Sequence, residues 1–151
     1  MEMRFCMLIC LCLSVGCGMP RDPDGTLLRV RGGTLRVGIT ENEPWTSLAD
    51  RPHGTEVELI EAFARQWDGK VVWSRDSESD LMESLGRGEL DVVIGGLQSS
   101  TPWVSHASLT QPYVEHEGRK LVMAVRQGEN RLLLELDKFL QRQRLKGATT
   151  P

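Results

Sequence analysis

The body of the chain lacks cysteine, and this absence limits its chemistry. The four cysteines all lie near the N-terminus, at Cys6, Cys10, Cys12 and Cys17. The rest of the sequence can therefore form no disulfide and no thiolate metal site. The chain also lacks repeats, low-complexity tracts and clusters of basic residues, and its net charge is only −3. This charge pattern gives no indication of a nucleic-acid partner.

The apolar run near the N-terminus is too short to cross a membrane. Phe5 to Leu13 is about nine residues, whereas a spanning helix needs roughly 20, and Arg4 precedes the run as in an export signal. The run ends in Leu13-Ser14-Val15-Gly16-Cys17, which resembles the lipobox of bacterial lipoproteins. We predict a lipoprotein signal peptide over residues 1–17, with the lipid on Cys17. The alternatives are an ordinary signal peptide and an uncleaved anchor.

Composition divides the remainder into three parts. Residues 18–33 are rich in proline, glycine and charge, which predicts a tether. Residues 34–146 are long enough for one domain with one core, and residues 147–151 are predicted to be a tail.

Hydrophobic periodicity predicts alternating strands and helices in this domain. Strands are expected over residues 35–40, 70–74 and 90–96, and helices from Gly54 to Trp67 and from Ser77 to Gly88. Thr55 and Glu58 have the spacing of a capping box at the start of the first of these helices. This order indicates an α/β fold with a mainly parallel sheet and helices on both faces.

The second half of the domain is less regular. Residues 98–117 show no periodicity, a fourth strand is predicted over residues 120–125, and a final amphipathic helix over residues 131–144. Its inward side chains are predicted to be Leu133, Leu136 and Leu140, with basic residues outward.

Two loops are predicted to meet where a ligand would bind. In an open parallel sheet, ligands bind outside the carboxyl ends of the strands. The loops there are Glu41-Asn42-Glu43-Pro44-Trp45 and Gly96-Leu97-Gln98-Ser99-Ser100, and we expect their two strands to be neighbours. They offer a carboxylate, an aromatic face, backbone N–H groups at glycine, an amide and hydroxyls. This set suits a small polar ligand, and it contains no acid–base pair, activated nucleophile, metal cluster or cofactor motif.

Their positions in the sequence predict the environments of the tryptophans and histidines. Trp67 and Trp73 fall on a helix face and a strand and are predicted to be core, whereas Trp45 and Trp103 fall in loops and are predicted to be exposed to ligand or partner. The three histidines, His53, His106 and His116, have no zinc-ligand spacing and are expected on the surface.

Four stretches together resemble one protein family. They are Leu35-Arg36-Val37-Gly38-Ile39-Thr40 with Pro44-Trp45, Gly54-Thr55-Glu56-Val57-Glu58-Leu59, the segment Leu85 to Gly96, and Leu109-Thr110-Gln111-Pro112-Tyr113. In this order they resemble the first lobe of the family 3 extracellular solute-binding proteins, the polar-amino-acid receptors of ABC importers. The resemblance implies the periplasmic binding protein type II fold.

Two departures from the family pattern bear on function. Trp103 stands where family members carry an arginine that clamps the ligand's α-carboxylate, and Ser100 stands at the last threonine of the preceding loop. An indole offers one N–H where a guanidinium offers a planar fork of donors, which argues against a free α-amino acid as ligand. The second lobe is also missing: residues 120–125 resemble the outgoing strand, and residues 124–136 resemble the returning segment.

These observations lead to a binding protein as the expected function. The expected ligand-binding residues are Glu41, Trp45, Gly96, Gln98, Ser100 and Trp103. The expected protein is a non-enzymatic lipoprotein of a membrane transport system, anchored in the cell envelope and facing the periplasm or the cell exterior. A membrane transporter, a second lipoprotein or a second copy of the chain would supply the missing half of the site. The alternatives are a module that docks a membrane protein through the same edge, and an enzyme similar to cyclohexadienyl dehydratase.

Overall fold

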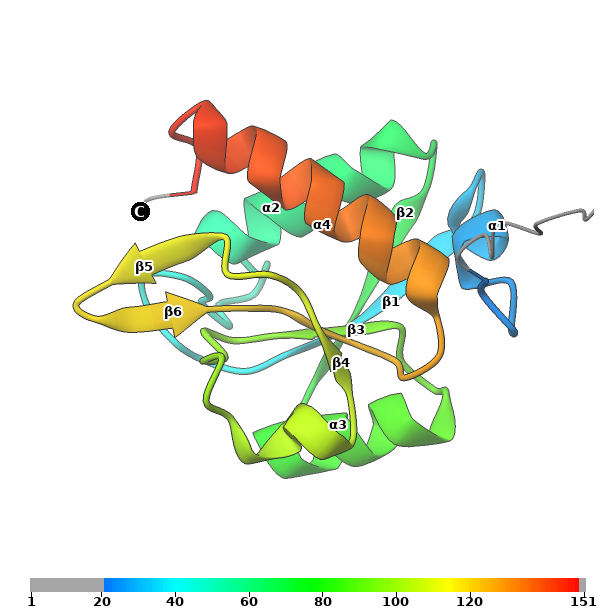
Figure 1. Cartoon of the computed structure of the whole chain (residues 1–151), viewed down its shortest axis with the longest axis horizontal. Helices are drawn as coiled ribbons and strands as arrows, with labels where there is room; N and C mark the ends of the chain where they lie inside the picture. The colour runs from blue at the N-terminus through cyan, green and yellow to red at the C-terminus, as the bar shows by residue number, and fades with distance from the viewer. Residues whose placement is uncertain (1–20, 150–151) are drawn as a thin grey trace, which may run out of the picture.

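A five-stranded sheet forms the centre of the computed structural model, which describes residues 21–149 (Figure 1). The strand order is β2-β1-β3-β7-β4. The strands are β1 (Thr34–Ile39), β2 (Lys70–Arg75), β3 (Val92–Ile94), β4 (Ser108–Leu109) and β7 (Ala124–Val125). β1 pairs in parallel with β2 and β3, whereas β7 runs antiparallel to β3 and β4. The predicted α/β class with a mainly parallel sheet is confirmed, and the predicted signal peptide lies outside the described residues.

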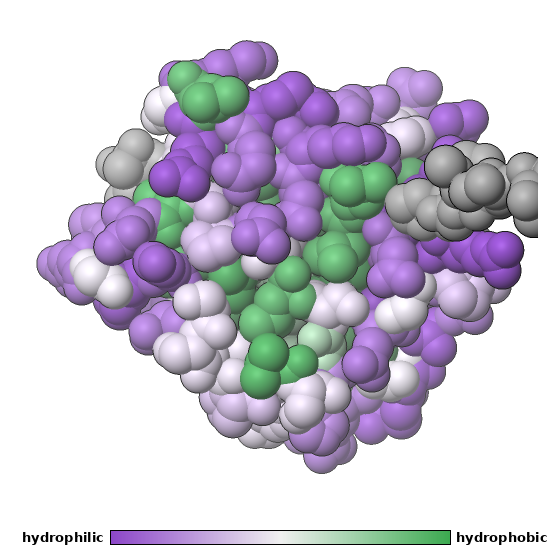
Figure 2. Space-filling view, viewed as in Figure 1, coloured by the Kyte–Doolittle hydropathy of each residue, from purple (hydrophilic) through white to green (hydrophobic). Residues whose placement is uncertain are grey.

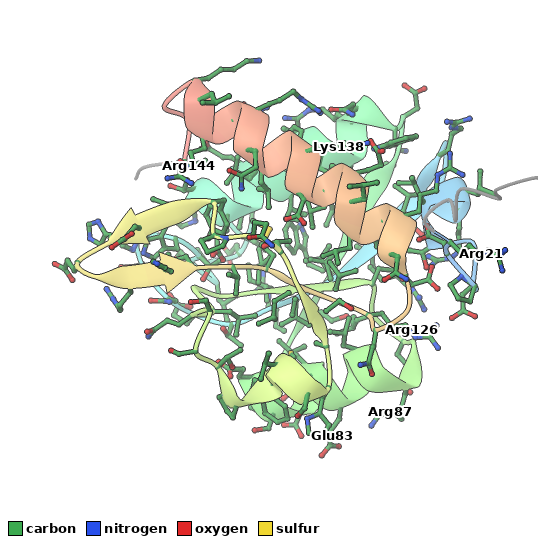
Figure 3. All side chains as sticks on the ribbon, in the orientation of Figure 1. Arg21, Glu83, Arg87, Arg126, Lys138 and Arg144 are labelled. Atoms are coloured by element: carbon green, nitrogen blue, oxygen red, sulfur yellow. The ribbon has the colours of Figure 1, made fainter. Side chains whose placement is uncertain are left out.

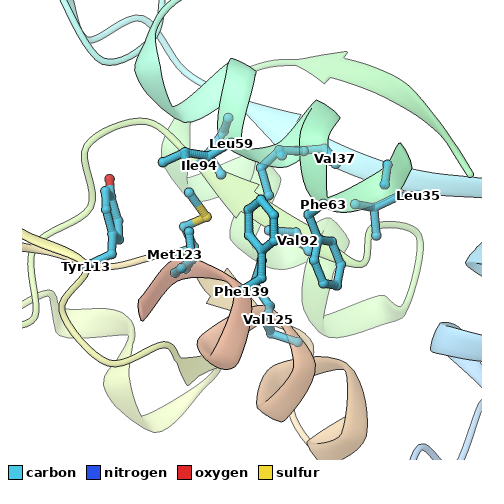
Figure 4. Close-up of a cluster of buried hydrophobic side chains, with 14 of the residues drawn as sticks. Leu35, Val37, Leu59, Phe63, Val92, Ile94, Tyr113, Met123, Val125 and Phe139 are labelled. Atoms are coloured by element: carbon cyan, nitrogen blue, oxygen red, sulfur yellow. The ribbon is translucent and has the colours of Figure 1, made fainter. Parts of the chain in front are cut away.

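Helices cover both faces of the sheet. α2 (Thr55–Gln66) and α4 (Asn130–Leu145) lie on one face and α3 (Glu78–Arg87) on the other (Figure 1). The larger core packs α2 and α4 onto β1 and β3, with Phe63 and Phe139 in edge-to-face contact at 5.6 Å between ring centroids (Figure 4). The smaller core packs Leu81, Met82 and Leu85 of α3 against the opposite face. The sheet is therefore buried on both sides, as the unbroken apolar sequence of β3 requires.

The predicted tether contains a helix that belongs to the fold. α1 (Thr26–Val30) buries Leu27 and Val30 in the larger core. Its start and the start of α4 are capped reciprocally. The Glu129 carboxylate accepts from the Thr26 backbone N–H at 3.2 Å, and the Asp22 carboxylate accepts from the Leu132 backbone N–H at 2.9 Å. Residues 22–33 are thus ordered by contacts about 100 positions away in sequence, which local composition does not reveal.

The region after β3 also differs from its prediction. Residues 98–117 include a short 3-10 helix, η1 (Pro102–Ser105), and strand β4. The predicted strand over residues 120–125 is split between β6 (Arg119–Leu121) and β7. β6 pairs with β5 (Val114–His116) in a two-stranded hairpin that projects from the body (Figure 1).

The observed helix N-caps and buried helix faces agree with the sequence predictions, with two exceptions. Ser77 caps α3, because its hydroxyl accepts from the Asp80 backbone N–H at 3.2 Å. The predicted capping box at Thr55 is wrong, since Gly54 is the N-cap of α2 and no side chain caps it. In α4, Leu136 and Leu140 are buried as predicted, whereas Leu133 is only partly buried and Leu132 takes the interior position.

Charged side chains cover the outer faces of the helices. Figure 3 shows Lys138 on α4 and Glu83 and Arg87 on α3 along the outside of the molecule, and all three are exposed. Figure 2 shows hydrophilic side chains over α4 and the hairpin, with hydrophobic side chains reaching the surface between α4 and α3. Within residues 21–149, no helix is both long enough and apolar enough to span a bilayer.

Candidate ligand-binding edge

The two loops singled out in the sequence lie side by side at one edge of the sheet. β1 and β3 are parallel neighbours, as predicted, with Ile39 paired to Ile94 at their carboxyl ends. The Thr40 backbone N–H donates to the Ile94 carbonyl at 3.2 Å, and the Asn42 side-chain amide donates to the Gly95 carbonyl at 2.9 Å. These two bonds hold the loop after β1 against the loop after β3.

The loop after β3 depends on two glycines. Gly95 has φ of 146° and Gly96 has φ of 66°, both outside the range that other residues adopt readily. A Cβ at either position would also collide with a side chain of the neighbouring loop, Thr40 at Gly95 and Asn42 at Gly96. Both the turn and the close approach of the loops therefore require glycine.

A buried carboxylate that the sequence did not identify lies beneath this turn. Glu56 is fully buried near the start of α2, and it accepts from the Gly95 backbone N–H at 2.8 Å and the Gly96 backbone N–H at 3.1 Å. The Tyr113 hydroxyl donates to the same carboxylate. Burial raises the pKa of Glu56, and these three hydrogen bonds act against that rise. The pKa of Tyr113 is also raised, first by burial and then by the neighbouring Glu56.

Glu56 changes what the edge can offer a ligand. The backbone N–H of Gly96 was expected to face the ligand, but it is directed at an internal carboxylate. The signal was present in the family motif from Gly54 to Leu59, yet the helix pattern alone does not distinguish a structural carboxylate from a polar surface residue. Its partner Tyr113 lies 57 positions later.

Two expected ligand-binding residues of the first loop do not face the edge freely. Trp45 is only 2% exposed and belongs to the larger core, so the prediction that it is exposed is wrong. Its ring meets the His116 ring of the hairpin edge-to-face at 5.6 Å. Glu41 is exposed, but its carboxylate accepts from the Leu48 backbone N–H at 3.0 Å and so closes its own loop.

The remaining predicted residues gather around a pocket of about 270 Å³. Its lining is Glu78, Gly96, Leu97, Gln98, Ser100, Thr101 and Pro102. Gly96, Gln98 and Ser100 were predicted from the sequence, whereas Glu78 was not. Glu78 is the first residue of α3, three positions after the end of β2, and the carboxyl end of β2 opens on the same edge as those of β1 and β3.

Trp103 lies beside this pocket and is hydrogen-bonded to Glu78 in its lining. Its indole N–H donates to the Glu78 carboxylate at 2.7 Å, and its ring packs partly buried against the smaller core. The ring is therefore not the exposed surface that was expected, although it is linked to the pocket through Glu78. Trp67 and Trp73, predicted as core, are partly buried against the larger core.

The pocket carries a negative charge. Glu78 is the one ionisable side chain in its lining. The nearby Arg75, at the end of β2, donates to the carbonyls of Leu48, Ala49 and Asp50 at 2.9–3.2 Å. Its guanidinium therefore braces the first loop and is not directed at the pocket.

Other hollows do not involve the predicted residues. One of about 340 Å³ lies between the hairpin and the end of α4, where Glu115, Lys120 and Arg144 give it mixed charge. No group of three or more His, Cys, Asp or Glu side chains within residues 21–149 could hold a metal ion.

Comparisons with known proteins agree with the fold. Residues 35–150 match bacterial extracellular solute-binding proteins, family 3. No curated protein matches the chain.

Solved structures give the same fold at low sequence identity. The arginine-bound form of domain 1 from TmArgBP has a TM-score of 0.68 at 22% identity, over 76% of this chain and 96% of that chain. An amino acid ABC transporter substrate-binding protein from Streptococcus pneumoniae, bound to L-arginine, has a TM-score of 0.71 at 13% identity, over 83% and 94%. AncCDT-1, an ancestral amino acid-binding protein described as a precursor of cyclohexadienyl dehydratase, has a TM-score of 0.69 at 15% identity, over 82% and 96%. The chain is thus similar to lobes of the type II periplasmic binding protein fold.

Proposed function

Because this chain belongs to the bacterial extracellular solute-binding proteins, family 3, we propose that it is a binding lipoprotein that presents a small polar solute to a membrane transporter. The observation that carries this proposal is the pocket of about 270 Å³ at the carboxyl ends of the strands. It contains three of the six residues expected to bind ligand, Gly96, Gln98 and Ser100, together with a carboxylate.

Ligand binding by a single lobe has a precedent in this fold. The family's usual site lies between two lobes, and closure buries the ligand on both sides. Domain 1 of TmArgBP has nevertheless been obtained in an arginine-bound form, which supports ligand binding by one lobe of this fold. In our chain, a surface of the transporter, of another lipoprotein or of a second copy would cover the exposed side of the solute.

The pocket favours binding over catalysis. Its ionisable side chain, Glu78, is bonded to an indole N–H, and no second ionisable group of the lining is within reach to form an acid–base pair. Likeness to a precursor of cyclohexadienyl dehydratase concerns the fold. No observation favours the enzyme, and the docking alternative loses its main support because Trp45 is buried.

A solute screen tests the proposal. The full chain is heated with individual polar metabolites at millimolar concentration, and the melting temperature is recorded. A solute present at 100 times its dissociation constant adds about 2.7 kcal/mol of stability, which gives a clear upward shift in melting temperature.

Matched serine variants identify the site. Ser100→Ala should reduce the shift because Ser100 lines the pocket, whereas Ser99→Ala should not, since Ser99 is equally exposed but outside the lining. A panel that produces no shift at all would count against solute binding.

A further inference from the structure

We propose that the pocket selects an organic cation, an amine or a guanidinium, that carries no carboxylate. This inference rests on the proposed solute-binding function and names the class of ligand. It comes from two observations: the charge of the pocket wall and the direction of the N–H groups behind it.

The pocket wall provides one negative charge and no positive charge. Glu78 supplies the carboxylate, and the other lining residues are neutral. The guanidinium of Arg75, at the end of neighbouring strand β2, is bonded to three loop carbonyls. A ligand carboxylate would therefore enter an acidic pocket without a cation to pair with it, whereas an ammonium or guanidinium would pair with Glu78.

The N–H groups of the two glycines in the loop after β3 are already used. Glycine-rich loops bind anions through N–H groups directed at the ligand. Here the N–H groups of Gly95 and Gly96 both donate to Glu56, which is buried on the inner side of the loop. Because the protein's own carboxylate occupies these donors, the loop does not offer them to a second anion.

The acceptors around the pocket match a cation with several N–H groups. A guanidinium has five N–H donors and no acceptor, and an ammonium has three donors. Gln98 and Ser100 are exposed in the lining and supply an amide oxygen and a hydroxyl oxygen beside the Glu78 carboxylate. Each of these oxygens can accept from the cation.

Trp103 holds the carboxylate in place. Its indole N–H donates to one oxygen of Glu78 at 2.7 Å, and its ring is packed against the core on the α3 side. The bond restricts an exposed side chain that would otherwise sample several rotamers, and it leaves the second oxygen available to a ligand. Trp103 is thus a positioning residue, and Glu78 contacts the ligand.

Three probes of defined charge test the proposal by calorimetric titration of the full chain. Agmatine carries a guanidinium and an amine without a carboxylate, L-arginine adds a carboxylate to the guanidinium, and L-glutamine has a neutral side chain. We expect agmatine to bind more tightly than L-arginine, and L-glutamine to bind most weakly. Glu78→Gln should weaken agmatine binding about tenfold or more, as expected for the loss of a charge-assisted bond.

Glu83→Gln is the matched control. Glu83 is an exposed glutamate on the same helix and does not line the pocket, so its replacement should leave the affinity for agmatine unchanged. The melting temperature of each variant, measured without probe, shows whether the fold is retained.

The possible results separate this inference from the proposed function. If L-glutamine or another neutral solute binds best and Glu78→Gln has no effect, the proposal of a cationic ligand is wrong, whereas the proposal of solute binding stands. If L-arginine binds more tightly than agmatine, the exclusion of carboxylates is wrong. If neither these probes nor any polar metabolite binds, both proposals are wrong.

Discussion

Two buried carboxylates, Glu56 and Asp91, lie at the two ends of β3. Glu56 binds the turn after β3, as described above. Asp91, directly before β3, accepts from the guanidinium of Arg29 at 2.7 Å and from that of Arg36 at 2.6 Å, and its side chain is 1% exposed. It also accepts from the Arg36 backbone N–H at 2.9 Å. One carboxylate therefore joins α1, β1 and β3.

The pKa of Asp91 gives its contribution a definite pH dependence. Burial acts to raise this pKa, but the hydrogen bonds from Arg36 and Arg29 outweigh it, so the pKa lies below the ordinary value of 3.8. A carboxyl group with a lowered pKa in the folded state stabilises the fold fully above its unfolded-state pKa. That stabilisation is lost as the pH falls through the folded-state value.

Asp91→Asn should therefore destabilise the protein most at neutral pH. We expect a loss of about 1–3 kcal/mol in the free energy of unfolding, because both guanidinium partners are about one-third exposed and can turn to solvent. Urea unfolding from about pH 7 to about pH 3 should show the difference from wild type shrinking below pH 3.8. The control is Asp68→Asn, at an exposed position with φ of 55° that asparagine tolerates. A difference that stays constant over this range would contradict the assignment.

Among the elements, α1 is the one whose role is least expected from the sequence. Its five residues are too few for a stable isolated helix, so its conformation depends on tertiary contacts. Leu27 and Val30 of α1 are buried in the core, and the carboxylate of Glu129, in the turn before α4, accepts from the backbone N–H of Thr26 in α1. α1 thus joins the beginning of the described chain to its last helix.

Neighbouring leucines on α1 allow a direct test of this role. Leu27 is 1% exposed and Leu28 is 61% exposed. We expect Leu27→Ala to lower the free energy of unfolding by about 2–5 kcal/mol, as for a buried leucine that leaves a cavity. Leu28→Ala should change it by less than about 0.5 kcal/mol. Similar losses for both variants in denaturant unfolding would mean that α1 is not packed as described.

The elements that were predicted well are those with a strong local pattern. β1, β2, α2, α3 and α4 each have hydrophobic periodicity over six or more residues, and each was placed within a few positions of its observed bounds. β4, β5, β6 and β7 have two or three residues each, and they are stabilised by pairing partners that a local pattern does not reveal.

The same distinction applies to the candidate site. Gly96, Gln98 and Ser100 follow a recognisable strand directly, so their place at the edge was predictable. The burial of Trp45 depends on the hairpin around His116, and the bond from Trp103 to Glu78 joins positions 25 apart. Side-chain direction in loops is determined by such contacts, which explains why Trp45 was misplaced and Glu78 was missed.

On the scale of the whole molecule, a short segment of sequence joins the lobe to its proposed anchor. Eight residues lie between Cys17 and the start of α1 at Thr26, and the fully extended chain from Cys17 to Thr26 spans at most about 30 Å. A lipid on Cys17 would therefore keep the lobe near the membrane surface, where a transporter is accessible.

Mass spectrometry of the protein purified from membranes tests the anchor. We expect the mature N-terminus to be Cys17 carrying a lipid, because the sequence before it resembles a lipobox. Cys17→Ser should abolish the modification, whereas Cys12→Ser, within the apolar run, should leave it intact. A mature chain that begins elsewhere, or a Cys17 without lipid, would contradict the lipoprotein assignment.

The short strand β7 bears on how a transporter would detect the proposed solute. In two-lobed relatives, the strands that cross between lobes form a hinge, and ligand binding changes the shape of the receptor. In this chain β7 leads from the hairpin through the turn at residues 126–129 into α4, and its two residues lie buried within the central sheet. We therefore expect solute binding to leave the outline of the described lobe nearly unchanged. A cation paired with Glu78 would instead neutralise the acidic edge, so a transporter would distinguish loaded from empty receptor by surface potential.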